Sequence, residues 1–90
     1  MAAQPYNSSV LDTYAVVLFK LGRYNEALKY IEKVVQNSKD ANPVYLEHYG
    51  DILFMKGEKE NALLQWQNSR ATGNHSEKLM RKINEKKYIK

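Results

Sequence analysis

The chain has 90 residues, of which 43% are hydrophobic and 27% charged, and it has no cysteine. This length suits one small domain, the composition is too apolar for a disordered chain, and the lack of cysteine excludes disulfides and thiolate metal sites. The net charge of +4 comes from residues 76–90, where six basic residues stand against two acidic ones, since residues 1–75 balance eight against eight.

The first elements expected in chain order are two helices within residues 7–41. Residues 1–6 are expected to be disordered, and residues 1–9 show neither the charged nor the apolar region of a signal peptide. Asn7 is a good N-cap residue, and Gly22 suits a left-handed helix stop. Apolar residues recur every three or four positions on either side of Gly22, as on one face of a helix. They are Leu11, Tyr14, Leu18 and Leu21 before it, and Ala27, Leu28, Ile31, Val34 and Val35 after it.

The same pattern returns in residues 42–75. Asn42 is a second N-cap candidate, and Pro43 suits the first helical position, where its missing N–H costs nothing. Gly57 and Gly73 suit helix stops. The apolar positions are Leu46, Tyr49, Ile52 and Leu53, and then Ala62, Leu63 and Trp66. No run is apolar and long enough to span a membrane.

A fifth helix is expected after Ser76, a good N-cap that follows His75. Its apolar side would hold Leu79, Met80 and Ile83, and its other side is strongly basic. No window of the chain alternates with the period of a half-buried strand. The sequence therefore predicts an all-α fold of five helices.

Sliding the chain by 35 residues aligns the two units with each other. The identities fall mostly at apolar or turn positions: Asn7/Asn42, Leu11/Leu46, Tyr14/Tyr49, Leu18/Leu53, Phe19/Phe54, Gly22/Gly57, Ala27/Ala62 and Leu28/Leu63. Small residues at Ala15, Gly50, Ala27 and Ala62 would let helix axes approach closely. Because glycine within a helix is costly, Gly50 is expected to have a packing role.

A repeated pair of helices of about 34 residues has the period of tetratricopeptide repeats. The chain resembles that family, most closely in LGRYNEAL at residues 21–28, although each unit is one residue longer and Lys39 and Asn74 replace the usual closing proline. The matching residues are Leu46, Tyr49, Gly50 and Leu53 with their equivalents Leu11, Tyr14, Ala15 and Leu18, and Ala62 with Trp66 and Ala27 with Ile31. The resemblance implies a right-handed solenoid of two repeats, residues 7–41 and 42–75, as at the C-terminal end of a bacterial-type repeat protein. Residues 76–90 would be its basic capping helix.

The resemblance also implies that the first helix of each unit lines a concave surface. The residues expected to form a peptide groove there are Asp12, Thr13, Val16, Phe19, Glu47, His48, Asp51, Phe54 and Met55, with Lys20 beside them. Three of them are carboxylates, which would repel an acidic ligand. We therefore expect a non-catalytic protein–protein interaction or scaffold module that binds a basic or apolar segment. The carboxylate clamp of the chaperone-adaptor members is not expected.

His48 lies three residues before Asp51, so both would share a helix face and raise the question of a metal or acid/base site. No third ligand or nucleophile follows from the spacing, and Thr13 and Val16 occupy the aligned positions of the first unit. We therefore expect no enzyme activity, metal, cofactor or small-molecule substrate.

Two alternatives for function stay open. One is self-association, as a homodimer through the apolar N-terminal face around Val10 and Val17, which in a longer protein would instead pack on a preceding repeat. The other is contact with nucleic acid or an acidic surface through the basic C-terminal helix. We consider nucleic acid the weaker alternative, because the basic residues lack interleaved aromatic residues apart from Tyr88.

Overall fold

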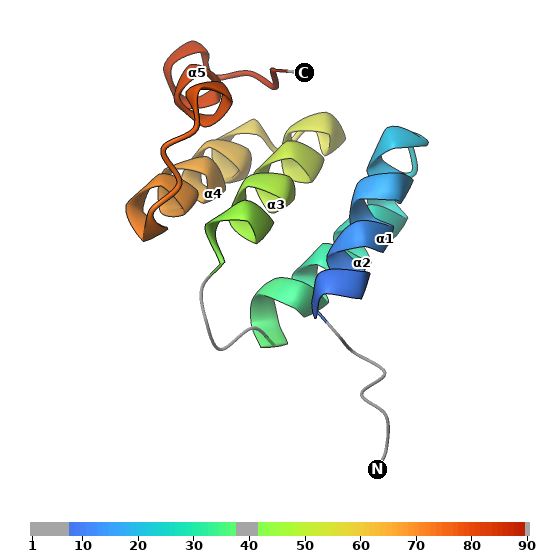
Figure 1. Cartoon of the computed structure of the whole chain (residues 1–90). Helices are drawn as coiled ribbons and strands as arrows, with labels where there is room; N and C mark the ends of the chain where they lie inside the picture. The colour runs from blue at the N-terminus through green and yellow to red at the C-terminus, as the bar shows by residue number, and fades with distance from the viewer. Residues whose placement is uncertain (1–7, 38–41, 90) are drawn as a thin grey trace.

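The computed structural model describes residues 8–37 and 42–89, and five α-helices make up most of these residues (Figure 1). The helices are α1 (Ser8–Lys20), α2 (Tyr24–Asn37), α3 (Pro43–Lys56), α4 (Lys59–Thr72) and α5 (Glu77–Glu85). These described residues contain no strand, and the all-α expectation is confirmed. No helix among them has the length and apolarity that a membrane span needs. The segment 1–6 and the Asn7 cap lie outside the described residues.

The helix ends follow the capping residues of the sequence. The Asn42 side chain accepts a hydrogen bond from the backbone N–H of Val44 at 2.9 Å, and Pro43 begins α3. Ser76 caps α5 in the same way by accepting from the Leu79 N–H at 3.1 Å. Both bonds satisfy backbone donors that have no partner within the helix. Gly57 ends α3 in the left-handed region, at φ 98°, as predicted.

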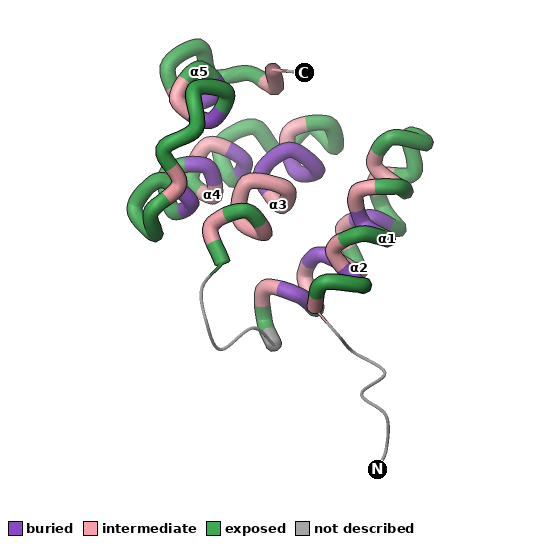
Figure 2. Tube along the Cα trace, in the orientation of Figure 1, coloured by how far each residue is buried: buried purple, intermediate pink, exposed green. Residues whose placement is uncertain are grey.

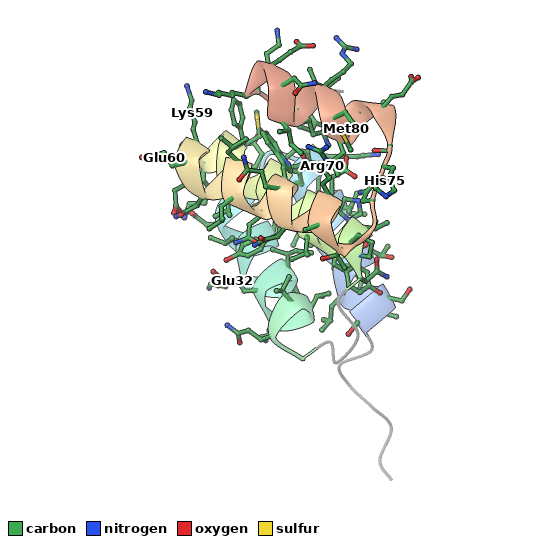
Figure 3. The ribbon with its side chains drawn as sticks, turned by 90° about the vertical axis from the view of Figure 1, so that its left-hand side faces the viewer. Glu32, Lys59, Glu60, Arg70, His75 and Met80 are labelled. Carbon is green, nitrogen blue, oxygen red and sulfur yellow. The ribbon has the colours of Figure 1, made fainter. Side chains whose placement is uncertain are left out.

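The helices pack as two hairpins followed by one more helix. α1 packs on α2 and α3 packs on α4, while α2 joins the two hairpins by packing on α3 (Figure 1). α5 packs on α4 (Figure 3). His75 lies in the connection between these two helices, whereas the exposed Lys59 and Glu60 extend away from the beginning of α4 (Figure 3).

Two apolar clusters form the core, and each joins one hairpin to the next element. All five helices contribute buried residues (Figure 2). The first cluster includes Ile52 of α3 among the residues of α1 and α2, and the second includes Leu79 of α5 among the residues of α3 and α4. The remaining buried members are Leu11, Ala15, Ala27, Ile31 and Val34 in the first, and Leu53, Ala62 and Trp66 in the second.

The packing role expected for Gly50 is confirmed. Gly50 is buried in α3 against the Trp66 ring of α4, and a Cβ atom added to it would lie 2.5 Å from the Trp66 Nε1 and 3.0 Å from the Ala62 carbonyl oxygen. Real Cβ atoms essentially never come closer than 3.0 Å to another heavy atom, so the Trp66 ring would have to shift to admit one. Glycine therefore lets α3 and α4 pack around a fully buried tryptophan.

Candidate functional site

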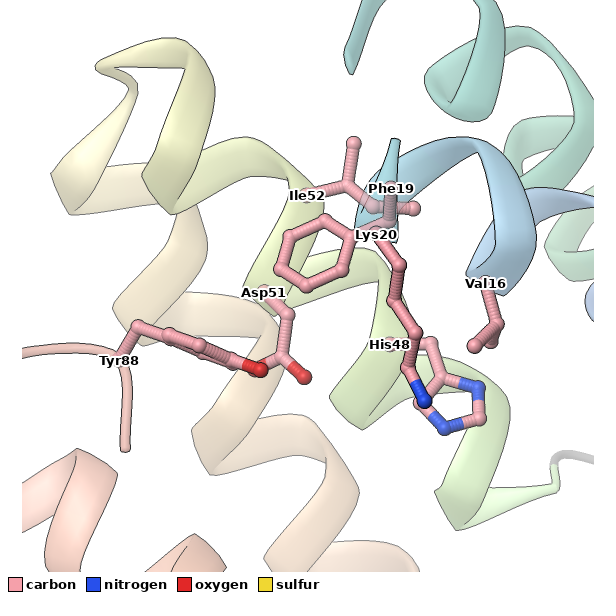
Figure 4. A pocket seen from close by; sticks show the side chains of 7 residues that line it. All are labelled: Val16, Phe19, Lys20, His48, Asp51, Ile52 and Tyr88. Carbon is pink, nitrogen blue, oxygen red and sulfur yellow. The ribbon is translucent and has the colours of Figure 1, made fainter. Parts of the chain in front are cut away.

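α1 and α3 come together at a small hollow on the side of the molecule where the C-terminal segment ends (Figure 4). Its volume is about 190 Å³, which is below the roughly 300 Å³ at which small-molecule pockets usually begin. The size suits a single side chain better than a cofactor. Val16, Phe19 and Lys20 line it from α1, and His48, Asp51 and Ile52 from α3, with Tyr88 at one end.

Glu47 and Asp51 of α3 are expected to line an open groove, but the structure covers both carboxylates. Asp51 is only 7% exposed, and its carboxylate accepts a hydrogen bond from the Trp66 Nε1 at 3.0 Å and lies 2.9 Å from the Lys82 Nζ. Glu47 accepts from the same Lys82 Nζ at 2.6 Å and from the Asn74 amide at 2.8 Å. The residues do share one face of α3, but the Lys82 side chain of α5 covers it.

Burial and pairing shift the ionisation of this cluster in different directions. Burial raises the pKa of Asp51 to about 6, although Lys82 and Trp66 oppose the rise. Burial also opposes ionisation of Glu47, but the hydrogen bond and charge of Lys82, aided by Asn74, lower its pKa. Burial would lower the pKa of Lys82, yet the two carboxylates outweigh it and raise that pKa. Lys82 is therefore charged at neutral pH and ties α5 to α3.

His48 pairs across the hairpins rather than with Asp51 on its own helix. Its Nδ1 lies 2.7 Å from the Asp12 Oδ1 of α1. Burial of the ring would lower the pKa of His48, but the hydrogen bond and charge of Asp12, together with the charges of Asp51 and Glu47, raise it above its ordinary value. Across residues 8–37 and 42–89, no three metal-ligating side chains gather closely enough to hold an ion.

The remaining predicted groove residues lie outside this hollow. The Thr13 hydroxyl is exposed and donates to the Ser9 carbonyl at 2.9 Å. Phe54 stacks on Trp66 with ring centroids 5.6 Å apart, so it packs against the core of the second hairpin. Met55 is 40% exposed and lines a second hollow.

Tyr88 lines the hollow, and sequence reasoning did not place it there. Lys86 ends α5 in a left-handed conformation, at φ 56°, and the segment after it runs back toward α1 (Figure 1). This places the Tyr88 ring 5.4 Å from the Phe19 ring, edge to face, and 5.3 Å from the Lys82 Nζ. Burial and the charge of Asp51 raise the pKa of Tyr88. An aromatic and an aliphatic residue directly after a basic run, Tyr88 and Ile89, were the available signal.

The Tyr88 ring lies between the two hollows. Phe19, Lys20 and Tyr88 line both of them, and the second has a volume of about 600 Å³. In the close view, the Tyr88 ring points toward the Asp51 carboxylate and the Phe19 ring lies above it (Figure 4). A side chain from the chain's own C-terminal segment thus forms part of the wall of both hollows.

The basic helix offers fewer free charges than its sequence suggests. Lys82 is 3% exposed and held by carboxylates. The Arg81 Nε lies 3.1 Å and the Lys87 Nζ 3.5 Å from the Glu85 carboxylate. This arrangement leaves nucleic-acid contact as the weaker alternative.

Comparisons of the chain with protein-family models, with curated proteins and with solved structures gave no match. The functional argument therefore rests on the two helical hairpins, the hollow between α1 and α3, and the side chains that line it.

Proposed function

We propose that the chain is a non-catalytic binding module that holds a short segment of a partner protein against α1 and α3. The observation that carries this proposal is the hollow between those helices, because its Val16, Phe19 and Ile52 walls are apolar and its Lys20 and His48 rim is polar. Apolar walls with a few polar groups are typical of recognition sites. The paired hairpins support a tetratricopeptide-like, right-handed arrangement, in which both helices would lie on the concave face.

The charges near the hollow favour a basic or apolar segment over an acidic one. Asp12, Glu47 and Asp51 outnumber the two nearby cations, the buried Lys82 and the rim residue Lys20, by one when His48 is neutral. Because fixed charges in a poorly solvated site act over several ångströms, this excess of one carboxylate acts on a bound segment even though the carboxylates are covered. An acidic ligand would add like charge to this cluster.

Affinity selection from a random peptide library displayed on phage tests this proposal, with Val16→Asp as the test variant and Leu64→Asp as its matched control. Val16 lines the hollow, whereas Leu64 is 50% exposed on α4. We expect selected peptides to lose at least about tenfold in affinity for Val16→Asp, since a buried unpaired charge opposes docking. They should bind Leu64→Asp unchanged. Equal binding to both variants would contradict the proposal.

Self-association is the second candidate, and the outer face of α1 favours it. Tyr14, Val17 and Leu21 are 54%, 50% and 67% exposed. Positions 35 residues after the first two, Tyr49 and Ile52, pack against the first core cluster. The exposed positions of α1 therefore correspond to positions of α3 against which another helix packs.

In such a dimer, the exposed face of α1 in one copy would pack against the same face of α1 in the other copy. In a head-to-tail arrangement, α1 of one copy would have to pack on α4 of the next copy, but α5 covers that face of α4. The packing therefore favours a two-fold dimer. Val17→Glu should convert such a dimer to a monomer in sedimentation equilibrium. A chain without substitutions that stays monomeric up to millimolar concentration would exclude this candidate.

A further inference from the structure

We propose that the surface around the hollow between α1 and α3 recognises an aromatic residue flanked by lysines, and that Tyr88 of the chain's own segment 86–89 takes the place of that residue in cis, at one end of the hollow. A partner segment of the same chemistry would have to displace Tyr88. The inference deepens the proposed function and rests on it. The observation behind it is that Tyr88, with Lys86 and Lys87 before it, lies on the residues that form the hollow.

The ring position is built by side chains that are themselves held in place. Phe19 presents its ring to Tyr88 at an interplanar angle of 71°, and Lys82 directs its ammonium group toward the ring. Lys82 cannot easily swing away, because Glu47 and Asp51 bind the same Nζ. Aromatic rings prefer edge-to-face neighbours and attract cations to their faces, so this arrangement selects an aromatic side chain over an aliphatic one.

The charges near the hollow favour basic residues next to the aromatic residue. The Asp51 carboxylate lies beside the Tyr88 side chain (Figure 4), and Asp12 and Glu47 are further carboxylates nearby, paired with His48 and Lys82. Lys86 and Lys87 precede Tyr88 and are exposed, with the Lys87 Nζ 3.5 Å from Glu85, and the excess of carboxylates in the cluster favours such a basic flank. The segment 86–89 thus displays the ligand chemistry that the groove was expected to bind.

The C-terminal segment 86–89 is bound weakly enough for a partner segment to displace it. Tyr88 and Ile89 are only partly buried, and in the described chain the backbone bonds that follow α5 run from the N–H groups of Lys86 and Lys87 to the Lys82 carbonyl. Tyr88 is therefore retained mainly by ring contacts at the end of a short tether. A short tether gives the attached segment an effective concentration of about 1 mM. If the segment alone has a Kd of about 0.1 mM, its presence lowers the apparent affinity of a competing partner segment about tenfold.

The test uses the full chain and a fluorescent peptide with the sequence of residues 84–89, NEKKYI. We expect Tyr88→Ala to bind this peptide at least about tenfold more tightly than the chain without substitutions. Replacing the tyrosine of the peptide by alanine should abolish binding. Tyr14→Ala is the matched control, because it removes an exposed tyrosine from the other face of α1 and should leave peptide affinity as it is in the unsubstituted chain.

Two further measurements keep the result decisive. Phe19→Ala added to Tyr88→Ala should remove the gained affinity, since Phe19 forms one wall of the ring position. If Tyr88→Ala lowers the melting temperature too far for the assay, Tyr88→Leu retains apolar bulk while losing both ring contacts, and it should show the same gain.

Equal peptide affinity with and without Tyr88 would overturn the cis occupancy. Absence of peptide binding to either Tyr88 variant would overturn the aromatic-basic recognition. Library peptides that still depend on Val16 would in that case leave the proposed function standing, so the two failures are distinguishable.

Discussion

The two hairpins share a sequence pattern but are packed differently. The first hairpin places Ala15 against an aliphatic residue, Ile31, and exposes the outer face of its first helix. The second places Gly50 against Trp66 and is covered by α2 on one side and α5 on the other. The comparison teaches that the repeated positions specify a hairpin, while the positions that differ decide what covers it.

Three differences between the hairpins are physically linked. Trp66 stands at the position equivalent to Ile31, and its larger ring requires glycine rather than alanine at position 50. The buried Nε1 of Trp66 requires an acceptor, which Asp51 supplies at 3.0 Å. A buried carboxylate in turn requires a cation, and Lys82 provides it from α5. The tryptophan thus explains why the second hairpin depends on a fifth helix.

The largest effect on stability is expected when the contact between the second hairpin and α5 is removed. Lys82→Ala leaves Glu47 and Asp51 buried without their shared cation, so we expect a loss of about 3–5 kcal/mol in the free energy of unfolding at pH 7, measured in urea. Lys29→Ala, at an exposed lysine of the first hairpin, should change stability by less than about 0.5 kcal/mol.

The loss caused by Lys82→Ala should shrink at lower pH. The pKa of Asp51 is already raised to about 6 in the folded chain, and removing Lys82 raises it further. A folded-state pKa above the unfolded one means that protonation favours folding, so the variant should recover stability as the pH falls from 7 to 5. A loss independent of pH would show that the ion cluster is not its cause.

A smaller effect on stability is expected from substitutions at the helix crossing within each hairpin. Gly50→Ala should destabilise the chain by about 1–3 kcal/mol, because the added Cβ overlaps the Trp66 ring and overpacking outweighs the better helix propensity of alanine. Ala15→Gly at the equivalent position should cost only about 0.5–1 kcal/mol. A neutral or stabilising Gly50→Ala in thermal unfolding would contradict the close packing.

The smallest effect concerns the pair that links the hairpins. The raised pKa of His48 means that its pairing with Asp12 contributes fully below pH 6.5, its unfolded value, and is lost as the pH rises through the folded pKa. We expect less than about 1 kcal/mol from this partly exposed pair. Asp12→Asn should lower the pKa of His48, as followed by NMR titration of the ring protons. An unchanged pKa would mean that the pair does not form.

Local sequence signals predicted the hairpins well. Asn42, Pro43 and Ser76 mark helix starts because their chemistry acts within one turn, and Gly50 stood out because glycine is costly inside a helix. The candidate site depends on contacts between separate helices, such as Asp12 with His48, which no local period encodes. Asp51 appeared to face outward because the helix alone does not show that α5 covers it.

The central claim is that a ligand segment docks between α1 and α3. NMR mapping of a library-selected peptide on the full chain tests it most directly. We predict that amide and side-chain shifts concentrate on residues 16–20, 48–52 and 86–89, with the Phe19 and Tyr88 rings among the largest. Shifts confined to the outer face of α1, around Tyr14 and Val17, or to the exposed side of α4 around Leu64, would contradict the account.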